Sequence, residues 1–288
     1  MSKNTASQTK SNLRSKVGDL LRLYPPVHKF ALFFERILKI PYNLAKLNLL
    51  GLQQYVGGRT KITFPEDATY NADGFTTTHF VAFLNDEKLS ESYQEALTFS
   101  DLNLAKKWST LDIRWRAHIT TWAAQQAARL EGDFIECGVW YGFLSKTICE
   151  YVEFETLANK TFYLVDTWGD PDKRELNHRG YPDDVFDIVK ERFKAYSNVK
   201  LVRGFVPNVL ENIKVDKVAY LSIDMNGDFA ERKTLERYYD LMVKGGIIYF
   251  DDYGWDYPKL RQTVDDFFKD KPESLLHFPS GNSIVVKL

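Results

Sequence analysis

Short β-type runs alternate with helical stretches along the second half of the chain, and this alternation constrains the fold more than any other feature of the sequence. The predicted strands are residues 133–137, 161–165, 199–202, 218–223 and 247–250. The predicted helices are residues 143–151, 185–196, 230–243 and 257–268. Such alternation is typical of βαβ units that form a parallel sheet. Residues 275–278 and 283–287, separated by Pro-Ser-Gly-Asn, predict a β-hairpin. We therefore expect an α/β fold with a mostly parallel, seven-stranded sheet that ends in an antiparallel hairpin.

The N-terminal part of the chain has a different character and predicts a separate extension. Residues 1–60 carry an excess of eight positive charges, and apolar residues are interspersed among these cations. This pattern predicts short amphipathic helices that pack on the core or on a second subunit, so we expect a homo-oligomer. Peripheral contact with an anionic membrane surface is the alternative. Residues 62–90 show no sustained period and predict loops, a lid or a connector, whereas residues 102–130 predict a helix that leads into the core. The expected division is residues 1–98 and 99–288.

Composition excludes several classes of protein. The 288 residues carry a formal net charge of -1 and are 44% hydrophobic, as in ordinary globular proteins, and no long apolar run predicts a membrane span. The polar N-terminus lacks the features of a signal peptide, so we expect a cytoplasmic protein, with the inner membrane surface as the alternative site. Cys137 and Cys149 fall in one predicted strand and the helix after it, which disfavours a disulfide framework. No nucleic-acid-binding module is recognisable.

The turn after the first predicted strand of the sheet is the first candidate site. Glu136 and Cys137 end the strand, and Gly138, Val139 and Gly142 lead into the helix. Glycines at such a turn let the backbone approach a nucleotide-like ligand next to the free amides of a helix N-terminus. An ordinary strand-to-helix turn is the alternative. Trp140 stands where a dinucleotide motif requires its second glycine, which disfavours a pyrophosphate ligand.

The next two predicted strands add further candidates at the same edge of the sheet. Asp166 ends the second strand, where Rossmann-type domains place an acid that accepts hydrogen bonds from ribose hydroxyls. Capping of the following turn, together with Thr167, is the alternative role of Asp166. Gly204 follows the third strand in the loop that passes the adenine in this topology. These residues predict a binding site for a nucleoside-containing cofactor.

Three carboxylates follow the last two parallel strands. Asp224 ends the strand 218–223, and Asp251 and Asp252 end the strand 247–250. Neighbouring carboxylates repel one another, and a hard divalent cation such as Mg²⁺ would keep them ionised and could hold a substrate hydroxyl. Solvated acids at strand ends are the alternative. Asp228 is a weaker candidate for the same cluster.

At this point four segments resemble a known family. Residues 132–139, 163–169, 220–226 and 245–253 resemble the macrocin O-methyltransferase (TylF-like) family, and the resemblance covers about residues 100–288. It implies the Rossmann-like fold of class I methyltransferases. It also implies that the glycine turn and Asp166 bind S-adenosylmethionine, and that Asp224, Asp251 and Asp252 hold Mg²⁺ near a sugar hydroxyl. Asp224 is also the implied general base.

The sequence departs from related families at the first of these acids. Residues 225–228 differ from the Asp-Gly-Asp of the antibiotic-sugar members, and Gly227 replaces the lysine of catechol-type enzymes, which disfavours a catechol mechanism. His118, on the predicted helix 102–130, is a second candidate for orienting the acceptor or for acting as base, because its unperturbed pKa lies near neutrality.

The expected function is transfer of a methyl group to a hydroxyl of a sugar or glycosylated metabolite, that is, to a small-molecule or glycan acceptor. Two other hypotheses stay open at this point. One is a non-catalytic methyltransferase-like scaffold recruited through the basic N-terminal helices. The other is a nicotinamide-dependent oxidoreductase on the same general fold, which the missing middle glycine disfavours.

Overall fold

A computed structural model describes residues 67–98, 112–169, 184–255 and 258–288. The compact unit that contains them begins at Asp67 and ends at Leu288. The predicted N-terminal helices, the first part of the predicted helix 102–130 and residues 170–183 lie outside the described residues. None of the described helices is both long and apolar enough to cross a membrane.

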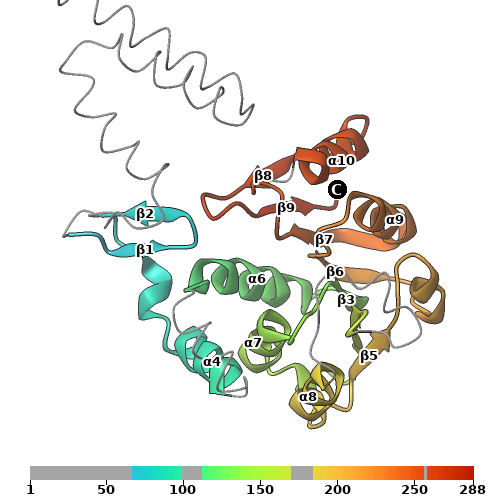
Figure 1. The fold of residues 1–288 in the computed structure, drawn as a ribbon, viewed down its shortest axis with the longest axis horizontal. Coiled ribbons are helices and arrows are strands. Elements are labelled where there is room, and N and C mark those ends of the chain that lie inside the picture. Colours follow the sequence, from blue (N-terminus) through green and yellow to red (C-terminus); the bar gives the residue numbers. More distant parts are fainter. Residues whose placement is uncertain (1–66, 99–111, 170–183, 256–257) are drawn as a thin grey trace, which may run out of the picture. The chain divides into compact units, whose positions relative to one another are not determined.

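A seven-stranded sheet forms the centre of the molecule, in the order β5-β4-β3-β6-β7-β9-β8 (Figure 1). The parallel strands are β3 (Asp133–Cys137), β4 (Phe162–Asp166), β5 (Val199–Arg203), β6 (Val218–Ile223) and β7 (Met242–Phe250). The hairpin of β8 (Leu275–His277) and β9 (Ser283–Val286) adds the two antiparallel strands. The predicted α/β fold is confirmed. The strand order reverses between β3 and β6, and ligands of such sheets bind beside this reversal, at the carboxyl ends of the strands.

Helices cover both faces of the sheet because the strands are apolar on both faces. On one face lie α6 (Arg114–Ala127), α7 (Phe143–Val152) and α8 (Val185–Phe193), which bury residues such as Phe134 and Tyr220. On the other lie α9 (Asp228–Tyr238) and α10 (Pro258–Phe268), together with the 3-10 helix η4 (Asn208–Asn212); they cover a second core cluster around Ile135 and Leu221. Figure 1 shows the resulting three layers.

Residues 67–98 pack on this core and contain more regular structure than the sequence predicts. They form a small hairpin of β1 (Tyr70–Ala72) and β2 (Phe75–Thr77), a 3-10 helix η1 (Ala82–Asn85) and α4 (Glu87–Thr98). Their apolar side chains share a core cluster with Ala117 of α6 and Phe143 of α7. The expectation of loops is therefore wrong for the described residues 67–90, and the compact unit begins at Asp67. The division at residue 99 stays a prediction.

Two predicted element boundaries need correction, although both elements exist. The predicted helix 230–243 begins at Asp228 and ends at Tyr238, and a 3-10 turn η5 (Tyr239–Leu241) follows it. Strand β7 begins at Met242 rather than at residue 247. Gly245, which has a φ of 82°, and Gly246 lie inside this strand and hide its period-2 pattern from a reading of the sequence.

Candidate active site

Gly138 brings the turn after β3 into direct contact with the loop after β6. Its φ is 92°, and a Cβ atom at this position would lie 1.8 Å from the carbonyl oxygen of Asp224. The backbone N–H of Asp224 in turn donates to the carbonyl of Cys137 at 2.8 Å. Only glycine combines this backbone conformation with so close an approach. The predicted cofactor turn and the first of the predicted metal ligands are therefore neighbours.

Asp166 organises the same turn from the end of β4. Its Oδ2 accepts hydrogen bonds from the backbone N–H groups of Val139 at 2.8 Å and Trp140 at 2.7 Å. Its Oδ1 lies 3.2 Å from the N–H of Trp168 and 3.3 Å from the hydroxyl of Thr167. The alternative role of Asp166, stabilisation of turns, is thus present in the structure. Recognition of a ribose by its carboxylate stays a prediction.

The loop after β4 is fixed by neighbouring groups. The Nε1–H of the buried Trp168 donates to the carbonyl of Trp140 at 2.6 Å. The guanidinium of Arg203 donates to the carbonyls of Trp168 and Gly169 at 2.8 and 3.0 Å. The N–H of Gly204 donates to the carbonyl of Asp166 at 2.9 Å. Hydrogen bonds therefore connect the turns after β3, β4 and β5 to one another.

Two further residues of the predicted cofactor site lie below its surface. Glu136 is buried, and its Oε2 accepts a hydrogen bond from Ser145 of α7 at 2.8 Å. Burial raises the pKa of Glu136 to about 8, so its carboxyl group holds a proton at neutral pH. Burial also raises the pKa of Cys137 to about 12, which leaves the thiol neutral. Both side chains support the turn from inside the protein. Gly142, with a φ of 70°, is the residue from which α7 begins.

The three predicted metal ligands converge, as the sequence predicts. Asp224, Asp251 and Asp252 each offer a carboxylate oxygen within 4.8 Å of the other two. Asp251 is buried, whereas the other two are partly exposed, so the cluster is open to solvent on one side. Asp228 is the exposed first residue of α9, and it is not among the three residues of this cluster. Three oxygen ligands at this spacing suit a hard divalent cation.

Asp251 is held by groups that reasoning from the sequence did not assign to the site. Its Oδ1 accepts from the hydroxyl of Tyr249 at 2.6 Å and from the amide of Asn282 at 3.2 Å. Its Oδ2 forms an ion pair with Arg116 of α6, and Arg116 also forms an ion pair with Asp73. Although burial disfavours the charged form of Arg116, the two aspartates raise its pKa above the ordinary value. The side of the cluster that faces the protein is thus charge-compensated.

A fourth acid, Glu231 of α9, lies beside the cluster and was also missed. It is buried and accepts hydrogen bonds from the backbone of Met225 and Asn226, in the loop that begins at Asp224. Burial, followed by the charge of Asp252, raises its pKa to about 8. Glu231 therefore fixes the loop that carries Asp224. Its place in the first turn of α9, among polar residues, gave no sign of burial in the sequence.

His118 is not brought to the carboxylates. Its ring stacks on Phe83, with 4.9 Å between the ring centroids, and burial lowers its pKa. Arg116 and His118 are two residues apart on α6, which places them about 200° apart around the helix. Arg116 faces Asp251, so His118 faces away from it. The predicted role of His118 in orienting the acceptor or acting as base stays a prediction.

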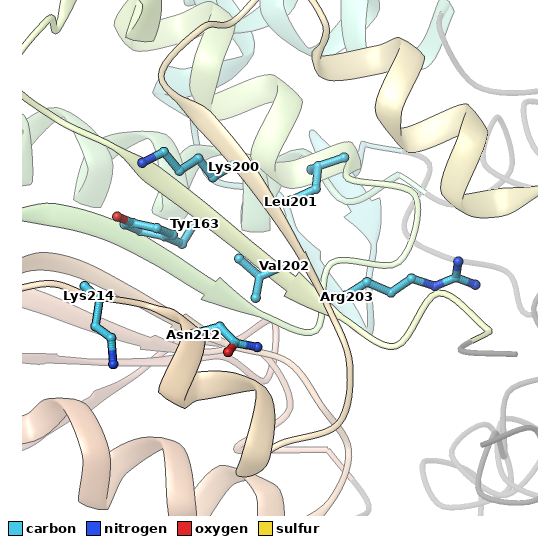
Figure 2. A pocket seen from close by; sticks show the side chains of 7 residues that line it. All are labelled: Tyr163, Lys200, Leu201, Val202, Arg203, Asn212 and Lys214. Atoms are coloured by element: carbon cyan, nitrogen blue, oxygen red, sulfur yellow. The ribbon is translucent and has the colours of Figure 1, made fainter. Parts of the chain in front are cut away.

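A separate surface groove of about 690 Å³ lies along the edge strand β5 (Figure 2). Its lining residues are Tyr163, Lys200, Leu201, Val202, Arg203, Asn212 and Lys214. Figure 2 shows Arg203 directed away from Asn212 and Lys214, in keeping with its bonds to the loop after β4. The residues that line the groove include no carboxylate, and the Lys200 ammonium lies 5.5 Å from the centre of the Tyr163 ring. We therefore place the candidate active site at the carboxyl ends of β3, β4, β6 and β7.

The doubly wound sheet, its final antiparallel hairpin and the glycine turn beside a carboxylate cluster define a class I methyltransferase fold. The family model of macrocin O-methyltransferase (TylF) matches residues 117–274. The chain belongs to this family, which confirms the predicted resemblance and makes it an S-adenosylmethionine-dependent methyltransferase by class. This assignment stands against a nicotinamide-dependent oxidoreductase. A search of the curated proteins finds no match.

One solved O-methyltransferase structure shares the fold, and two further solved methyltransferase structures show a weaker similarity. The O-methyltransferase NovP is 18% identical over 60% of this chain and 79% of its own, with a TM-score of 0.52. An O-methyltransferase from Bacillus cereus in complex with SAH is 13% identical over 68% of this chain and 91% of its own, with a TM-score of 0.49. The SAH-bound Podospora anserina methyltransferase PaMTH1 is 16% identical over 70% of this chain and 88% of its own, with a TM-score of 0.48.

Proposed function

We propose that the protein transfers a methyl group from S-adenosylmethionine to a hydroxyl group of a sugar or glycosylated metabolite, with the help of a divalent cation such as Mg²⁺. The observation that carries this proposal is the contact between the glycine turn at Gly138 and the backbone of Asp224, beside the convergent carboxylates. A cofactor on the turn and an acceptor at the cluster would therefore be neighbours.

The residues at the turn fit S-adenosylmethionine. Helix α7 begins directly after Gly142, and the first N–H groups of a helix have no partner within it, so they can receive a carboxylate. Asp166 lies at the adjoining strand end, where a ribose can be recognised. The Trp168 side chain donates a hydrogen bond to the backbone carbonyl of Trp140 and so stabilises the turn. Glu136, held neutral by its burial, adds no repulsive charge beneath it.

The residues at the cluster fit a hard divalent cation, since all three offer carboxylate oxygens. When bound, the cofactor supplies the methyl group on its sulfonium, and the cation lowers the pKa of an acceptor hydroxyl. Asp224 is the residue that takes the hydroxyl proton, because it is partly exposed and adjoins the glycine turn. Glu231 keeps the loop of Asp224 in place through its bonds to Met225 and Asn226. Asp251 and Asp252 complete the oxygen ligands.

The experiment that tests this function is a calorimetric titration of the full-length protein with S-adenosylmethionine, its demethylated product and NAD, each with and without Mg²⁺. We expect micromolar binding of the methyl donor or its product and none of NAD. A screen of sugar-hydroxyl acceptors, with methyl transfer measured in Mg²⁺ and in EDTA, then tests the chemistry. Full turnover in EDTA would contradict the role of the cation, and binding of NAD alone would contradict the choice of cofactor.

The predicted contacts of residues 1–60 remain proposals of their own, because these residues lie outside the described part of the chain. We propose that this basic segment mediates assembly into a homo-oligomer, with peripheral membrane contact as the alternative. Its apolar residues support assembly with a second copy, and its excess of eight positive charges supports contact with an anionic surface. Sedimentation of the full-length protein and of a variant that lacks residues 1–60, each with and without anionic vesicles, distinguishes the two.

A further inference from the structure

Arg116 occupies the inner side of the carboxylate cluster. Its side chain is 13% exposed and pairs with Asp251, whose side chain is 5% exposed, and with Asp73, whose side chain is 1% exposed. The guanidinium also lies 5.0 Å from the centre of the Trp255 ring. Such a group is held in one place by two carboxylates and an aromatic ring, and desolvated ion pairs of this kind have little freedom to rearrange.

Asp73, the second partner of Arg116, is positioned by the tight turn between β1 and β2. Register pairs Ala72 with Phe75, so Asp73 and Gly74 form the two-residue loop of the small hairpin. Both have positive φ values, 52° and 76°, as a type I′ turn requires, and Asp-Gly is a preferred sequence for it. The two carboxylate oxygens of Asp73 accept from the Nε and Nη2 atoms of Arg116 at 2.7 and 2.8 Å. The hairpin therefore fixes the orientation of the guanidinium.

Three of the residues in this arrangement lie outside the region that matches the family model. Asp73 and Arg116 precede residue 117, and Asn282 follows residue 274. The ligands themselves, Asp224, Asp251 and Asp252, lie within it. The region that matches the family model thus contains the carboxylate cluster but not Arg116, the cationic side chain that pairs with it.

We propose that Arg116 is a positioning residue that serves as a built-in counter-cation of the carboxylate cluster, and that it lowers the affinity of the cluster for a divalent ion. This inference rests on the proposed metal site. Arg116 neutralises Asp251 from the inner side, while a metal ion approaches from the solvent side through Asp224 and Asp252. A fixed positive charge that touches one ligand repels a second cation, so the ion is held loosely and exchanges. The hairpin of β1 and β2 sets this affinity through Asp73.

The test is titration of the full-length protein with Mn²⁺, with the free ion measured by electron paramagnetic resonance. We expect Arg116→Met to bind Mn²⁺ about tenfold more tightly than the unsubstituted protein, because it removes a unit charge next to a ligand. Asp73→Asn keeps a residue that tolerates the turn but removes an anion, and its Mn²⁺ affinity is expected to fall several-fold. Arg116→Lys retains the charge and should stay close to the unsubstituted protein.

Arg114→Met is the matched control. Arg114 lies on the same helix, is 42% exposed in its side chain and pairs with Asp112 rather than with the cluster. Its replacement should leave Mn²⁺ binding unchanged. A role of Arg116 in folding alone would weaken binding or leave it the same, so unchanged or weaker Mn²⁺ binding by folded Arg116→Met overturns the inference.

A second measurement keeps this inference separate from the proposed metal site. If the unsubstituted protein binds no Mn²⁺, or if its binding survives Asp252→Asn, the metal site itself fails. Thermal unfolding in EDTA then tests the counter-charge directly. Arg116→Met should lower Tm, and the addition of Asp251→Asn should recover part of that loss, because one of the two buried carboxylates left without Arg116 is then neutral. If the double variant unfolds at the same temperature as Arg116→Met or lower, the counter-cation role is wrong. If Arg116→Met is too unstable for the Mn²⁺ titration, this comparison of Tm values between the single and double variants tests the counter-cation role by itself.

Discussion

The two halves of the carboxyl edge of the sheet use the same residue type in different ways. On the β3–β4 side, Asp166 is compensated by backbone N–H groups of the turn that it stabilises. On the β6–β7 side, Asp251 is compensated by side chains: a guanidinium, a tyrosine hydroxyl and an asparagine amide. Backbone donors come with the turn itself, whereas side-chain donors must be brought from other elements. The first half is therefore a local structure, whereas the second depends on the tertiary fold.

The largest loss of stability should come from a substitution at the contact between the two halves. Gly138→Ala places a Cβ atom 1.8 Å from the Asp224 carbonyl oxygen, in a residue with a φ of 92°. We expect a loss of ~3 kcal/mol or more in the free energy of unfolding, together with loss of cofactor binding. Urea denaturation and calorimetric titration measure the two.

Gly74→Ala is the control for backbone strain in that experiment. Gly74 also has a positive φ, 76°, but nothing lies within 4 Å of an added Cβ atom. Its replacement should lower the free energy of unfolding by about 1 kcal/mol, because only the left-handed conformation disfavours alanine there. If the two alanine variants lose the same stability, the close approach between the two loops is not what Gly138 provides.

The stability of the β3–β4 side should depend on pH through Glu136. The pKa of Glu136 is raised to about 8 by burial, from an ordinary value of 4.5. Between these values the folded protein keeps a proton that the unfolded chain releases, so stability falls as the pH rises through this range. Glu136→Gln imitates the neutral form. Its unfolding free energy should therefore decline less with pH, by up to about 1.4 kcal/mol per pH unit between pH 5 and 8.

Chemical denaturation at several pH values between 5 and 8 measures this difference. The unsubstituted protein and Glu136→Gln are compared at each pH. Parallel stability curves for the two proteins would show that Glu136 is ionised in the folded state, contrary to the burial that the structure shows.

A smaller effect is expected at the other half. Tyr249→Phe removes the hydroxyl that donates to Oδ1 of Asp251 at 2.6 Å, in a fully buried position. We expect a loss of about 1.5–3 kcal/mol in the free energy of unfolding, the range for a hydrogen bond to a charged group. Tyr220→Phe is the matched control, because Tyr220 is equally buried and its hydroxyl has no hydrogen-bond partner among the described residues. Equal losses in the two variants would contradict the assignment of Tyr249 to the support of Asp251.

The sequence predicts the residues at the strand ends of both halves, but not the side chains that other elements bring to them. The strand ends, the glycine turn and the three cluster aspartates follow from hydrophobic period and from the topology of a parallel sheet, and the structure brings the three aspartates together. Arg116 and Asp251 are 135 residues apart in the chain, and no periodicity relates them. Arg116 stands two residues before His118 on the same helix, and only the rotation of α6 decides which of them faces the cluster.

The hairpin of β1 and β2, which precedes α6 in the chain, was the least predictable part of the described fold. Strands β1 and β2 have three residues each, too few for an alternating pattern to be recognised, and the two short elements are stabilised by packing on α6. The Asp-Gly pair at residues 73–74 was the one available signal of a hairpin there. Its significance for the cluster becomes visible only when Arg116 is placed beside it.

The central claim is that one half of the edge binds the cofactor and the other carries the chemistry. The most direct test measures binding of S-adenosylhomocysteine and methyl transfer for Asp166→Asn and Asp224→Asn side by side, by calorimetry and by an acceptor assay. We predict that Asp166→Asn weakens binding tenfold or more, and that Asp224→Asn leaves binding within about twofold of the unsubstituted protein while methyl transfer falls at least 100-fold. Equal loss of cofactor binding in both variants, or normal turnover by Asp224→Asn, would contradict it.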